Sequence, residues 1–359
     1  MKALGLMAPG KVAWIEKERP VAGPYDAVVQ PTAIAPCSSD VHTAFEGGAP
    51  KPSGFVLGHE ALGTVVEVGS LVKDFKAGDK VVVPAGTPDW RARGIQEHNF
   101  KHPSGPFSSF MLSGSRDGVF AELFLVNDAD NNLAAMPPDV SVDDALMTVD
   151  MVSTGFTGAE MADVKFGDTV CVIGIGPVGL MAVAGARLRG AARIIAVGTR
   201  PDCVALAREY GATDVVSYKE GNLAKQVLAL TGGRGTDSTI IAGGKAETFA
   251  LAVAMTRFGG GTVANINYFT DAEYLPVPTL AFGRGMAGKT IRGDLCEGGR
   301  VRIERLLAMI RYGRIQPGRM VSHRFHGFGK LEEAFYLMRD KPPDLIKPVV
   351  YIDWAGEKL

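Results

Sequence analysis

Features that mark secreted, membrane-bound or nucleic-acid-binding proteins are scarce in this sequence. Its 359 residues include only four cysteines, which are widely spaced and form no C-x-x-C pair: Cys37, Cys171, Cys203 and Cys296. That spacing indicates neither a disulfide framework nor a structural zinc ribbon, and it favours a reducing, cytoplasmic setting. Charges or glycines interrupt each apolar run before it reaches membrane-spanning length, and the first residues lack the basic-then-apolar layout of a secretory signal. The net charge of -1 gives no electrostatic reason to expect nucleic acid or an anionic membrane as a partner.

What the sequence does contain predicts a two-domain globular protein. A length of 359 residues with 46% hydrophobic residues is enough for two separate cores. Residues 1–150 hold short valine runs between glycines and prolines, at 27–29, 63–69 and 80–83, which predict short strands and a β-rich domain. The polar stretch 84–118, which carries glycines and prolines, predicts a surface lobe or loop.

The pattern changes at about residue 151, where apolar runs begin to alternate with helical segments. Thr169–Ile173 is a continuous apolar run of the kind that buried parallel strands require, and a helix of small residues is predicted at 178–188. The other predicted elements are strands at 193–197, 239–242 and 262–266, a helix at 301–312 and a strand at 349–351. This repetition predicts an α/β domain over 151–295 with a doubly wound parallel sheet, and the stretch 296–359 is expected to return to the first domain.

A glycine-rich loop in the second domain indicates dinucleotide binding. Gly174-Ile175-Gly176-Pro177-Val178-Gly179 follows a predicted strand and opens a predicted helix. Glycines there permit a tight turn and close approach of a pyrophosphate, and the helix N-terminus supplies free N–H groups. The alternative is an ordinary glycine-rich turn between a strand and a helix.

The end of the next strand distinguishes NADP from NAD. A site for NAD usually has an acidic residue there for the ribose 2′-hydroxyl. This strand instead ends in Gly198-Thr199-Arg200, and no carboxylate follows until Asp202. The Arg200 guanidinium can bind a 2′-phosphate through two hydrogen bonds, which favours NADP. The alternative for Arg200 is a solvated surface charge.

Candidate zinc ligands are present in the first domain. Cys37 and the pair His59-Glu60 offer a thiol, an imidazole and a carboxylate, although a lone cysteine is more often buried and inert. Strand alternation would direct Glu60 to the face opposite His59. Catalytic zinc takes three protein ligands and keeps one open position, so a third ligand is needed. Asp150 stands among apolar residues, where a carboxylate is costly to bury unless it is paired or bound to metal, but it could equally cap a helix or lie on the surface.

These residues resemble the signature of a known enzyme family. Gly58-His59-Glu60-x-x-Gly63-x5-Gly69-x-x-Val72 resembles the zinc signature of the medium-chain alcohol dehydrogenases, and the loop 174–179 is similar to their cofactor loop. Within that family the resemblance is to the NADP-dependent secondary alcohol dehydrogenases of anaerobic bacteria and some protists. The segments 14–20, 87–91 and 198–201 are similar to that subgroup, and the resemblance covers almost the whole chain.

The resemblance implies a fold, a metal and a set of site residues. The implied fold is a GroES-like β-rich catalytic domain with a Rossmann cofactor domain, and the implied assembly is a homotetramer. The implied zinc ligands are Cys37, His59 and Asp150, with Glu60 exchangeable, and the implied proton path runs through Ser39 and His42. The implied cofactor contacts are the loop 174–179, then Gly198, Thr199, Arg200 and Tyr218 around the 2′-phosphate, Ile266, Asn267 and Tyr268 near the nicotinamide, and Lys341.

The chain departs from the family pattern in ways that bear on zinc and substrate. It has no cysteine between Cys37 and Cys171 for a structural zinc, an absence that the subgroup shares. Phe110 stands where the subgroup usually has tryptophan, and Gly86 where a bulkier residue is usual, and both positions belong to the substrate pocket. We therefore expect one catalytic zinc, NADP(H), and reversible oxidation of secondary alcohols to ketones. The alternatives are a zinc-dependent polyol dehydrogenase, against which the apolar lobe around Phe110 argues, and a non-enzymatic NADP-binding protein.

Overall fold

The computed structural model describes residues 1–46 and 51–356, and the chain divides into two compact units. One unit comprises Met1–Ser153 and Glu297–Leu359, and the other comprises Thr154–Cys296. The two stretches of the first unit are joined through β16 (Lys347–Tyr351), which pairs antiparallel with β3 (Ala27–Ile34). The strand predicted at 349–351 is therefore present and lies in the sheet of the first unit.

The first unit is built mainly on antiparallel strands, as its short valine runs predict. The larger sheet runs in the order β15-β16-β3-β5-β6-β8, with β7 also paired to β3, and a smaller sheet runs β2-β1-β4. The strands are β1 (Lys2–Ala8), β2 (Lys11–Glu16), β4 (Phe55–Val56), β5 (Ala61–Val68), β6 (Lys80–Val83), β7 (Phe124–Val126), β8 (Ala134–Ala135) and β15 (Val321–His326). The helices are α1 (Ser38–Phe45), α2 (Arg93–Gln96), α3 (Ala129–Asn132), α4 (Val142–Met147), α10 (Arg300–Arg311) and α11 (Leu331–Asp340), with the π-helical turn η1 (Thr148–Val152) and the 3-10 turns η3 (Pro317–Met320) and η4 (Phe328–Lys330). The stretch 84–118 is mostly irregular and carries only the short α2, in agreement with the predicted lobe.

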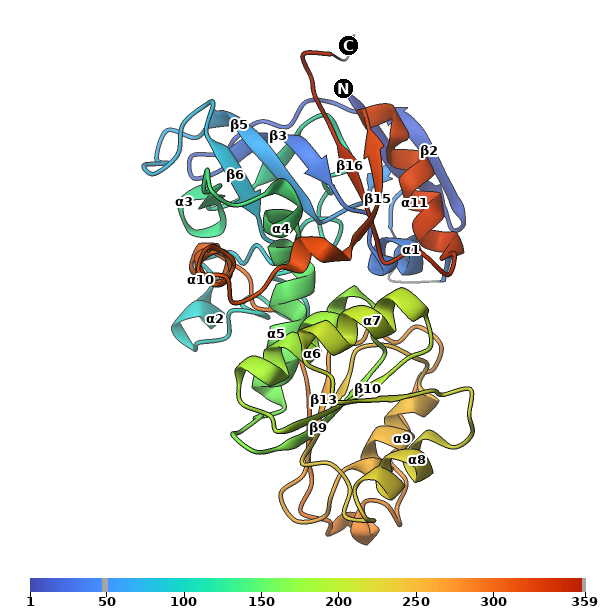
Figure 1. The fold of residues 1–359 in the computed structure, drawn as a ribbon. Helices are drawn as coiled ribbons and strands as arrows, with labels where there is room; N and C mark the ends of the chain where they lie inside the picture. Colours follow the sequence, from blue (N-terminus) through green and yellow to red (C-terminus); the bar gives the residue numbers. More distant parts are fainter. Residues whose placement is uncertain (47–50, 357–359) are drawn as a thin grey trace. The chain divides into compact units, whose positions relative to one another are not determined.

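Helix α11 shows how the core of this unit forms. Its apolar residues Leu331, Ala334, Phe335 and Met338 recur at helical spacing, and all four are buried. The helix lies alongside β15 and β16 in Figure 1. The ring of Phe335 meets that of Phe120 edge to face with centroids 6.1 Å apart, which is a favourable geometry for two aromatic rings.

The second unit contains the predicted doubly wound sheet. Its strands are parallel and run in the order β11-β10-β9-β12-β13-β14, and Figure 1 shows α6 and α7 on one face with α8 and α9 on the other. The strands are β9 (Thr169–Ile173), β10 (Arg193–Val197), β11 (Asp214–Val216), β12 (Ser238–Ile241), β13 (Thr262–Asn265) and β14 (Thr290–Gly293). The helices are α5 (Ser153–Met161), α6 (Pro177–Leu188), α7 (Pro201–Tyr210), α8 (Leu223–Leu230) and α9 (Glu247–Met255), with the 3-10 turn η2 (Gly283–Gly285). The strand order reverses between β9 and β12, which is where doubly wound sheets bind their ligands.

Within the described residues, no helix combines the length and the apolar character that crossing a membrane requires.

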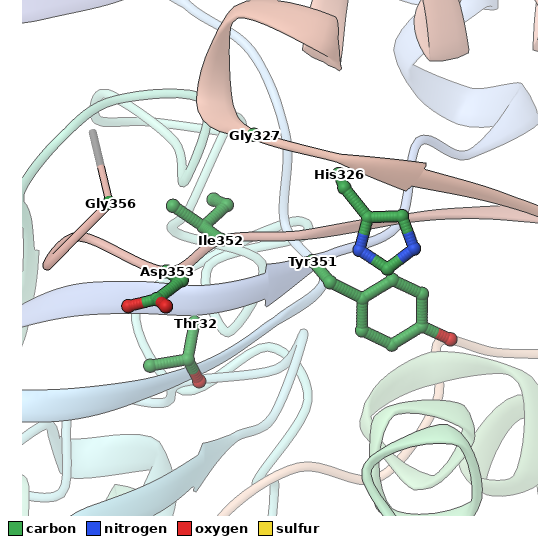
Figure 2. Close-up of a pocket in the computed structure, with 7 residues that line it drawn as sticks. All are labelled: Thr32, His326, Gly327, Tyr351, Ile352, Asp353 and Gly356. Carbon is green, nitrogen blue, oxygen red and sulfur yellow. The ribbon is translucent and has the colours of Figure 1, made fainter.

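The first unit contains a hollow of about 330 Å³. Its lining residues include Thr32, His326, Tyr351 and Asp353, and in Figure 2 the His326 imidazole stacks on the Tyr351 ring. None of the site residues predicted from the sequence lines this hollow.

Candidate functional site

Neighbouring strands of the first unit bring the predicted metal ligands together. Cys37 follows the end of β3, and His59 precedes the start of β5, which runs antiparallel to β3 with Ile34 opposite Ala61. Gly58 has a φ of +91°, and a Cβ there would lie 2.1 Å from the Phe120 ring, so only glycine permits this approach to His59. The fourth residue of the cluster, Asp150, comes from the π-helical turn η1, and such turns are frequent at functional sites.

The cluster has the dimensions of a tetrahedral zinc site. The ligand atoms of Cys37, His59, Glu60 and Asp150 lie within 4.8 Å of one another. Asp150 Oδ2 lies 3.7 Å from Cys37 Sγ and 3.6 Å from His59 Nε2. Ordinary zinc bond lengths place neighbouring ligands of a tetrahedral site about 3.4–3.6 Å apart. A thiol, an imidazole and carboxylates at this spacing fit zinc by both donor type and size.

Glu60 lies in this cluster, contrary to the expectation from strand alternation. Its Oε1 is 3.7 Å from His59 Nε2, and both side chains are buried. That expectation was wrong because β5 begins only at Ala61, so His59 and Glu60 occupy an irregular segment. The two-residue alternation of side chains holds only within a strand.

A buried lysine that sequence analysis did not identify also belongs to the site. Lys347 Nζ donates a hydrogen bond of 2.8 Å to Glu60 Oε1 and lies 2.8 Å from Glu60 Oε2. Lys347 begins β16, which is adjacent to β3 in the sheet. The signal was available, because a lysine among the apolar residues 345–350 raises the same question of unpaired buried charge that identified Asp150.

Burial and mutual charge shift the pKa values of the cluster. Burial raises the pKa of the Cys37 thiol, and the Lys347 ammonium opposes this only in part. Burial likewise raises the pKa of Glu60 to about 7 against the opposing effect of Lys347. Burial lowers the pKa of His59, but the carboxylates of Asp40, 3.0 Å from His59 Nδ1, and of Asp150, together with Cys37, outweigh burial, and the pKa rises well above its usual value. A divalent cation would favour the deprotonated thiol and neutral imidazole that these shifts otherwise oppose.

The two residues of the predicted proton path lie on α1. Ser39 Oγ is 3.3 Å from His59 Nε2, which places this hydroxyl beside the metal cluster. One turn later, His42 Nδ1 lies 2.5 Å from Glu46 Oε2, and Glu46 is exposed to solvent. Residues three and seven positions apart share a helix face. Ser39, His42 and Glu46 therefore follow one face from the cluster toward solvent, and Glu46 was not identified from the sequence.

The two predicted pocket residues also lie near the cluster. The Phe110 ring meets the His59 imidazole edge to face, with centroids 4.9 Å apart. Gly86 is held on both sides: the N–H of Ala85 donates to the carbonyl of Val149, next to Asp150, and the N–H of Thr87 donates to the carbonyl of Ser109, next to Phe110.

In the second unit, the glycines of the predicted cofactor loop are required by the backbone. The loop follows β9 and opens α6, and Gly174 has a φ of +87°. A Cβ at Gly179 would lie 1.8 Å from the Gly174 carbonyl oxygen, and one at Gly198 would lie 2.2 Å from Ile175 Cγ1. Pro177 occupies the first turn of α6, where its missing N–H costs no hydrogen bond. The remaining N–H groups of that turn are available to an anion.

The residues predicted to bind the 2′-phosphate of NADP lie beside this loop. Thr199 Oγ1 donates a hydrogen bond of 3.2 Å to the Tyr218 hydroxyl oxygen. Arg200 Nη2 lies 3.8 Å from the position of a Cβ built on Gly176, so the guanidinium stands next to the loop. No carboxylate follows β10 before Asp202, which lies in the first turn of α7. A cation and the Thr199 hydroxyl after β10, joined by the Tyr218 hydroxyl after β11, suit a phosphate better than a ribose hydroxyl.

The remaining residues predicted to contact the cofactor belong to both units. Ile266, Asn267 and Tyr268 follow the end of β13, and the Asn267 side-chain amide donates a hydrogen bond of 3.1 Å to the Gly244 carbonyl. Lys341 ends α11 in the first unit with a left-handed φ of +45°. The role of all four residues in cofactor binding stays a prediction.

The chain combines a cluster of metal-ligating side chains on a GroES-like β domain with a doubly wound dinucleotide domain. This combination defines the class of zinc-dependent medium-chain oxidoreductases. Residues 23–138 match the alcohol dehydrogenase GroES-like domain family, and residues 177–310 match the zinc-binding dehydrogenase family. The chain is 56% identical to an NADP-dependent isopropanol dehydrogenase of Thermoanaerobacter brockii, over 98% of this chain and 100% of that one. It is 50% identical to the enzyme of the same name from Entamoeba histolytica, over 99% and 97%. The fold is similar to that of zinc-dependent alcohol dehydrogenase 2 from Streptococcus pneumonia, with a TM-score of 0.88, 28% identity and coverage of 99% and 100%.

The chain therefore belongs to the zinc-binding alcohol dehydrogenase family, as the sequence motifs predicted.

Proposed function

We propose that this protein catalyses reversible hydride transfer between NADP(H) and secondary alcohols or ketones, with one catalytic zinc per chain. The cluster of Cys37, His59 and Asp150, with the spacing of a tetrahedral zinc site, carries the proposal. The relatives named NADP-dependent isopropanol dehydrogenases support both the cofactor and the substrate class. In this proposal residues 1–150 and 296–359 form the catalytic domain, and 151–295 bind the dinucleotide.

Cys37, His59 and Asp150 would hold the zinc, and the second layer of contacts orients them. Asp40 Oδ1 is 3.0 Å from His59 Nδ1 and accepts from the N–H of Gly58, while its Oδ2 accepts from the N–H of Cys37. With its proton on Nδ1 facing Asp40, His59 offers the lone pair of Nε2 to the metal. Zinc bound there supplies Lewis-acid chemistry, which makes the alcohol more acidic and the ketone more electrophilic.

Ser39 and His42 move the proton of the alcohol. Ser39 Oγ, beside His59, accepts the hydroxyl proton as its own proton leaves toward His42, and His42 passes a proton on along the face of α1. An imidazole can both accept and donate a proton through its two ring nitrogens, which suits His42 to this step. Glu46, at 2.5 Å from His42 Nδ1, lies at the solvent end of this path.

The second unit binds the cofactor, which supplies the hydride chemistry. The loop 174–179 presents the N–H groups of α6 to the pyrophosphate. Thr199, Arg200 and Tyr218, with Gly198 leaving room, bind the 2′-phosphate, and the guanidinium gives most of the selectivity through charge-assisted hydrogen bonds. Ile266, Asn267, Tyr268 and Lys341 complete the proposed contacts.

We further propose that the protein is a cytoplasmic homotetramer. Strand β14 stands at the edge of its sheet with all four residues exposed, so its outer N–H and C=O groups can pair with another chain. Large apolar side chains are also exposed in the segment before it, at Tyr274, Leu280 and Met286. Exposed edges of this kind that carry apolar side chains favour association.

A substrate panel tests the proposed activity directly. The purified protein should reduce acetone and butan-2-one with NADPH, and should oxidise propan-2-ol with NADP, because the apolar ring of Phe110 beside the cluster suits a carbonyl with small alkyl groups. Initial rates are followed through nicotinamide absorbance. Sorbitol oxidation faster than propan-2-ol oxidation would favour a polyol dehydrogenase, and NADPH binding without turnover of any substrate would favour a non-enzymatic protein.

The smaller residues at positions 110 and 86 lead to a second expectation, which concerns the size of the ketone. Phe110 replaces an indole by a smaller ring, and Gly86 has no side chain, so kcat/KM should rise with ketone size. Each additional buried methylene is worth about 0.8 kcal/mol, or roughly fourfold in kcat/KM, where space exists. Phe110→Trp should reverse this trend while leaving acetone reduction largely intact.

The matched control for this change is Phe107→Trp, which alters an exposed ring of the same lobe. It should leave the dependence on ketone size unchanged. If aryl ketones react far more slowly than acetone, and Phe110→Trp does not alter that ratio, neighbouring side chains such as Met111 already fill the space.

A further inference from the structure

Arg302, on helix α10, is a nearly buried cation that the chemistry described above does not use. Its side chain is only 10% exposed. Two of its nitrogens donate hydrogen bonds to a single residue: Nε to Ser153 Oγ, at 3.2 Å, and Nη2 to the Ser153 carbonyl oxygen, at 3.1 Å. Removing a guanidinium from water is costly, so a cation held this deeply against one serine suggests a role for that contact.

Ser153 connects Arg302 to the backbone of the metal-ligand candidate Asp150. The serine is fully buried, and its N–H donates a hydrogen bond to the carbonyl of Asp150. Its hydroxyl donates a hydrogen bond of 2.7 Å to the carbonyl of Glu297. Because a hydroxyl has one proton to donate and lone pairs that accept, Ser153 Oγ serves Glu297 and Arg302 at the same time. A continuous chain of hydrogen bonds therefore runs from Arg302 through Ser153 to Asp150.

The segment that follows Glu297 contacts the backbone at position 86. The N–H of Gly299 donates a hydrogen bond of 3.1 Å to the Gly86 carbonyl, and a Cβ on Gly298 would lie 1.9 Å from that oxygen. Next to Gly86, the N–H of Ala85 donates to the carbonyl of Val149, the residue before Asp150. These contacts complete a ring of hydrogen bonds around the turn that carries Asp150.

The turn η1 needs such support because its geometry is unusual. It lies between α4 and α5 without a break, so the chain from 142 to 161 is one helix with a π-helical turn in its middle. A π-helical turn inserts one additional residue, and each residue of a helix rotates the direction of its side chain by about 100°. Relaxation of the turn to ordinary α-helical geometry would therefore rotate the Asp150 carboxylate away from Cys37 and His59. Helix α10, which carries Arg302, packs against this turn.

We propose, on the basis of the zinc-dependent function above, that Arg302 is a positioning residue: through Ser153 it holds the π-helical turn in place and so keeps the Asp150 carboxylate directed at the metal. A planar guanidinium suits this role, because its fixed fork of donors reaches the hydroxyl and the carbonyl of one serine together. A lysine ammonium offers no such fork and would hold the serine less firmly.

Zinc affinity tests the proposal without relying on turnover. Arg302→Met removes the hydrogen-bond donors and keeps most of the length of the side chain. The Kd for zinc, measured by competition with a chelator, should rise about tenfold, because loss of a contact that orients a ligand typically weakens metal binding by about 10- to 100-fold. The visible spectrum of the Co²⁺-loaded variant should also change, because it depends on the geometry of the ligands. The kcat for propan-2-ol should fall, whereas the KM for NADP should stay unchanged because the loop 174–179 is intact.

Companion variants separate this role from a structural one. Ser153→Ala removes the hydroxyl that Arg302 contacts and should weaken zinc binding in the same direction. Adding it to Arg302→Met should weaken binding little further, because residues that act through one contact are not additive. Arg302→Lys should give an intermediate Kd. Arg314→Met, at an exposed arginine just beyond α10, controls for the loss of one positive charge and should leave Kd and spectrum unchanged.

The outcomes that overturn the proposal are distinct from failure of the proposed function. An unchanged zinc Kd and cobalt spectrum in Arg302→Met, with only a lower melting temperature, would reduce Arg302 to a structural role. If Arg302→Met fails to fold, an unchanged Kd in Ser153→Ala would contradict the proposal instead. Absence of ketone reduction by the unmodified, zinc-loaded protein would reject the function, whereas zinc affinity and cobalt spectra report on Arg302 independently.

Discussion

Replacing Asp150 with asparagine is expected to remove the catalytic metal and to lower the oxidation of propan-2-ol by about 1,000-fold or more. Asp150 Oδ2 lies 3.7 Å from Cys37 Sγ and 3.6 Å from His59 Nε2, so in the proposed site it supplies the third ligand. The amide keeps the shape of the side chain but loses a negative charge that would neutralise zinc. The loss of Lewis-acid stabilisation, several kcal/mol, accounts for the size of the expected effect.

Metal analysis after dialysis measures this effect alongside the rate. The unmodified chain should hold about one zinc per chain, because Cys37 is the only cysteine that belongs to a group of possible metal ligands within the described residues, and the Asp150→Asn variant should hold far less. Asp139→Asn, at a half-exposed carboxylate of the same unit, is the matched control and should retain both metal and rate. Retention of a full zinc and normal turnover by Asp150→Asn would exclude Asp150 as a ligand, and two tightly held zinc ions per chain would contradict a single site.

The fold could be read from the sequence wherever burial is strong enough to produce a pattern. The run at 169–173 is nearly all buried in β9, and its continuous apolar character predicted a central parallel strand. Strand β14 escaped prediction because all four of its residues are exposed, so Thr290–Gly293 carries no apolar run. Edge strands are defined by pairing with a neighbour, and that pairing leaves little trace in local sequence.

The candidate site was predictable where its residues lie close together in the sequence, because local spacing then determines how they are arranged. The loop 174–179 was identified because its glycines are required by contacts within the loop itself, such as the clash that a Cβ at Gly179 would make with the Gly174 carbonyl. Lys347 and Glu60 are 287 residues apart, and their meeting depends on the order of β16, β3 and β5 in the sheet. The side on which Glu60 lies was mispredicted for a related reason, since it depends on where β5 begins, and strand ends are the least regular part of a strand.

Exchanging Arg200 for glutamate is expected to turn the cofactor preference from NADP toward NAD. The guanidinium lies beside the loop 174–179, with Nη2 3.8 Å from the Cβ position of Gly176. Thr199, the residue before it, is hydrogen-bonded to the Tyr218 hydroxyl. Loss of charge-assisted hydrogen bonds to the 2′-phosphate costs about 1.5–3 kcal/mol, and repulsion by the new carboxylate adds to it. We therefore expect kcat/KM for NADP to fall about 100-fold or more. A carboxylate at this position can accept from the ribose 2′-hydroxyl, so kcat/KM for NAD should rise.

The variant should fold, which keeps the comparison clean. Position 200 immediately precedes α7, and a negative side chain at a helix N-terminus is favoured by the helix dipole. The matched control is Arg208→Glu on the exposed face of the same helix, which changes the net charge equally and should leave the ratio of kcat/KM for NADP and NAD unchanged. Both cofactors are compared at one fixed, moderate ionic strength, because salt weakens long-range attraction of the phosphate to any exposed arginine. Equal activity of the unmodified protein with NAD and NADP, or an equal loss in Arg208→Glu, would show that general charge rather than Arg200 governs the choice of cofactor.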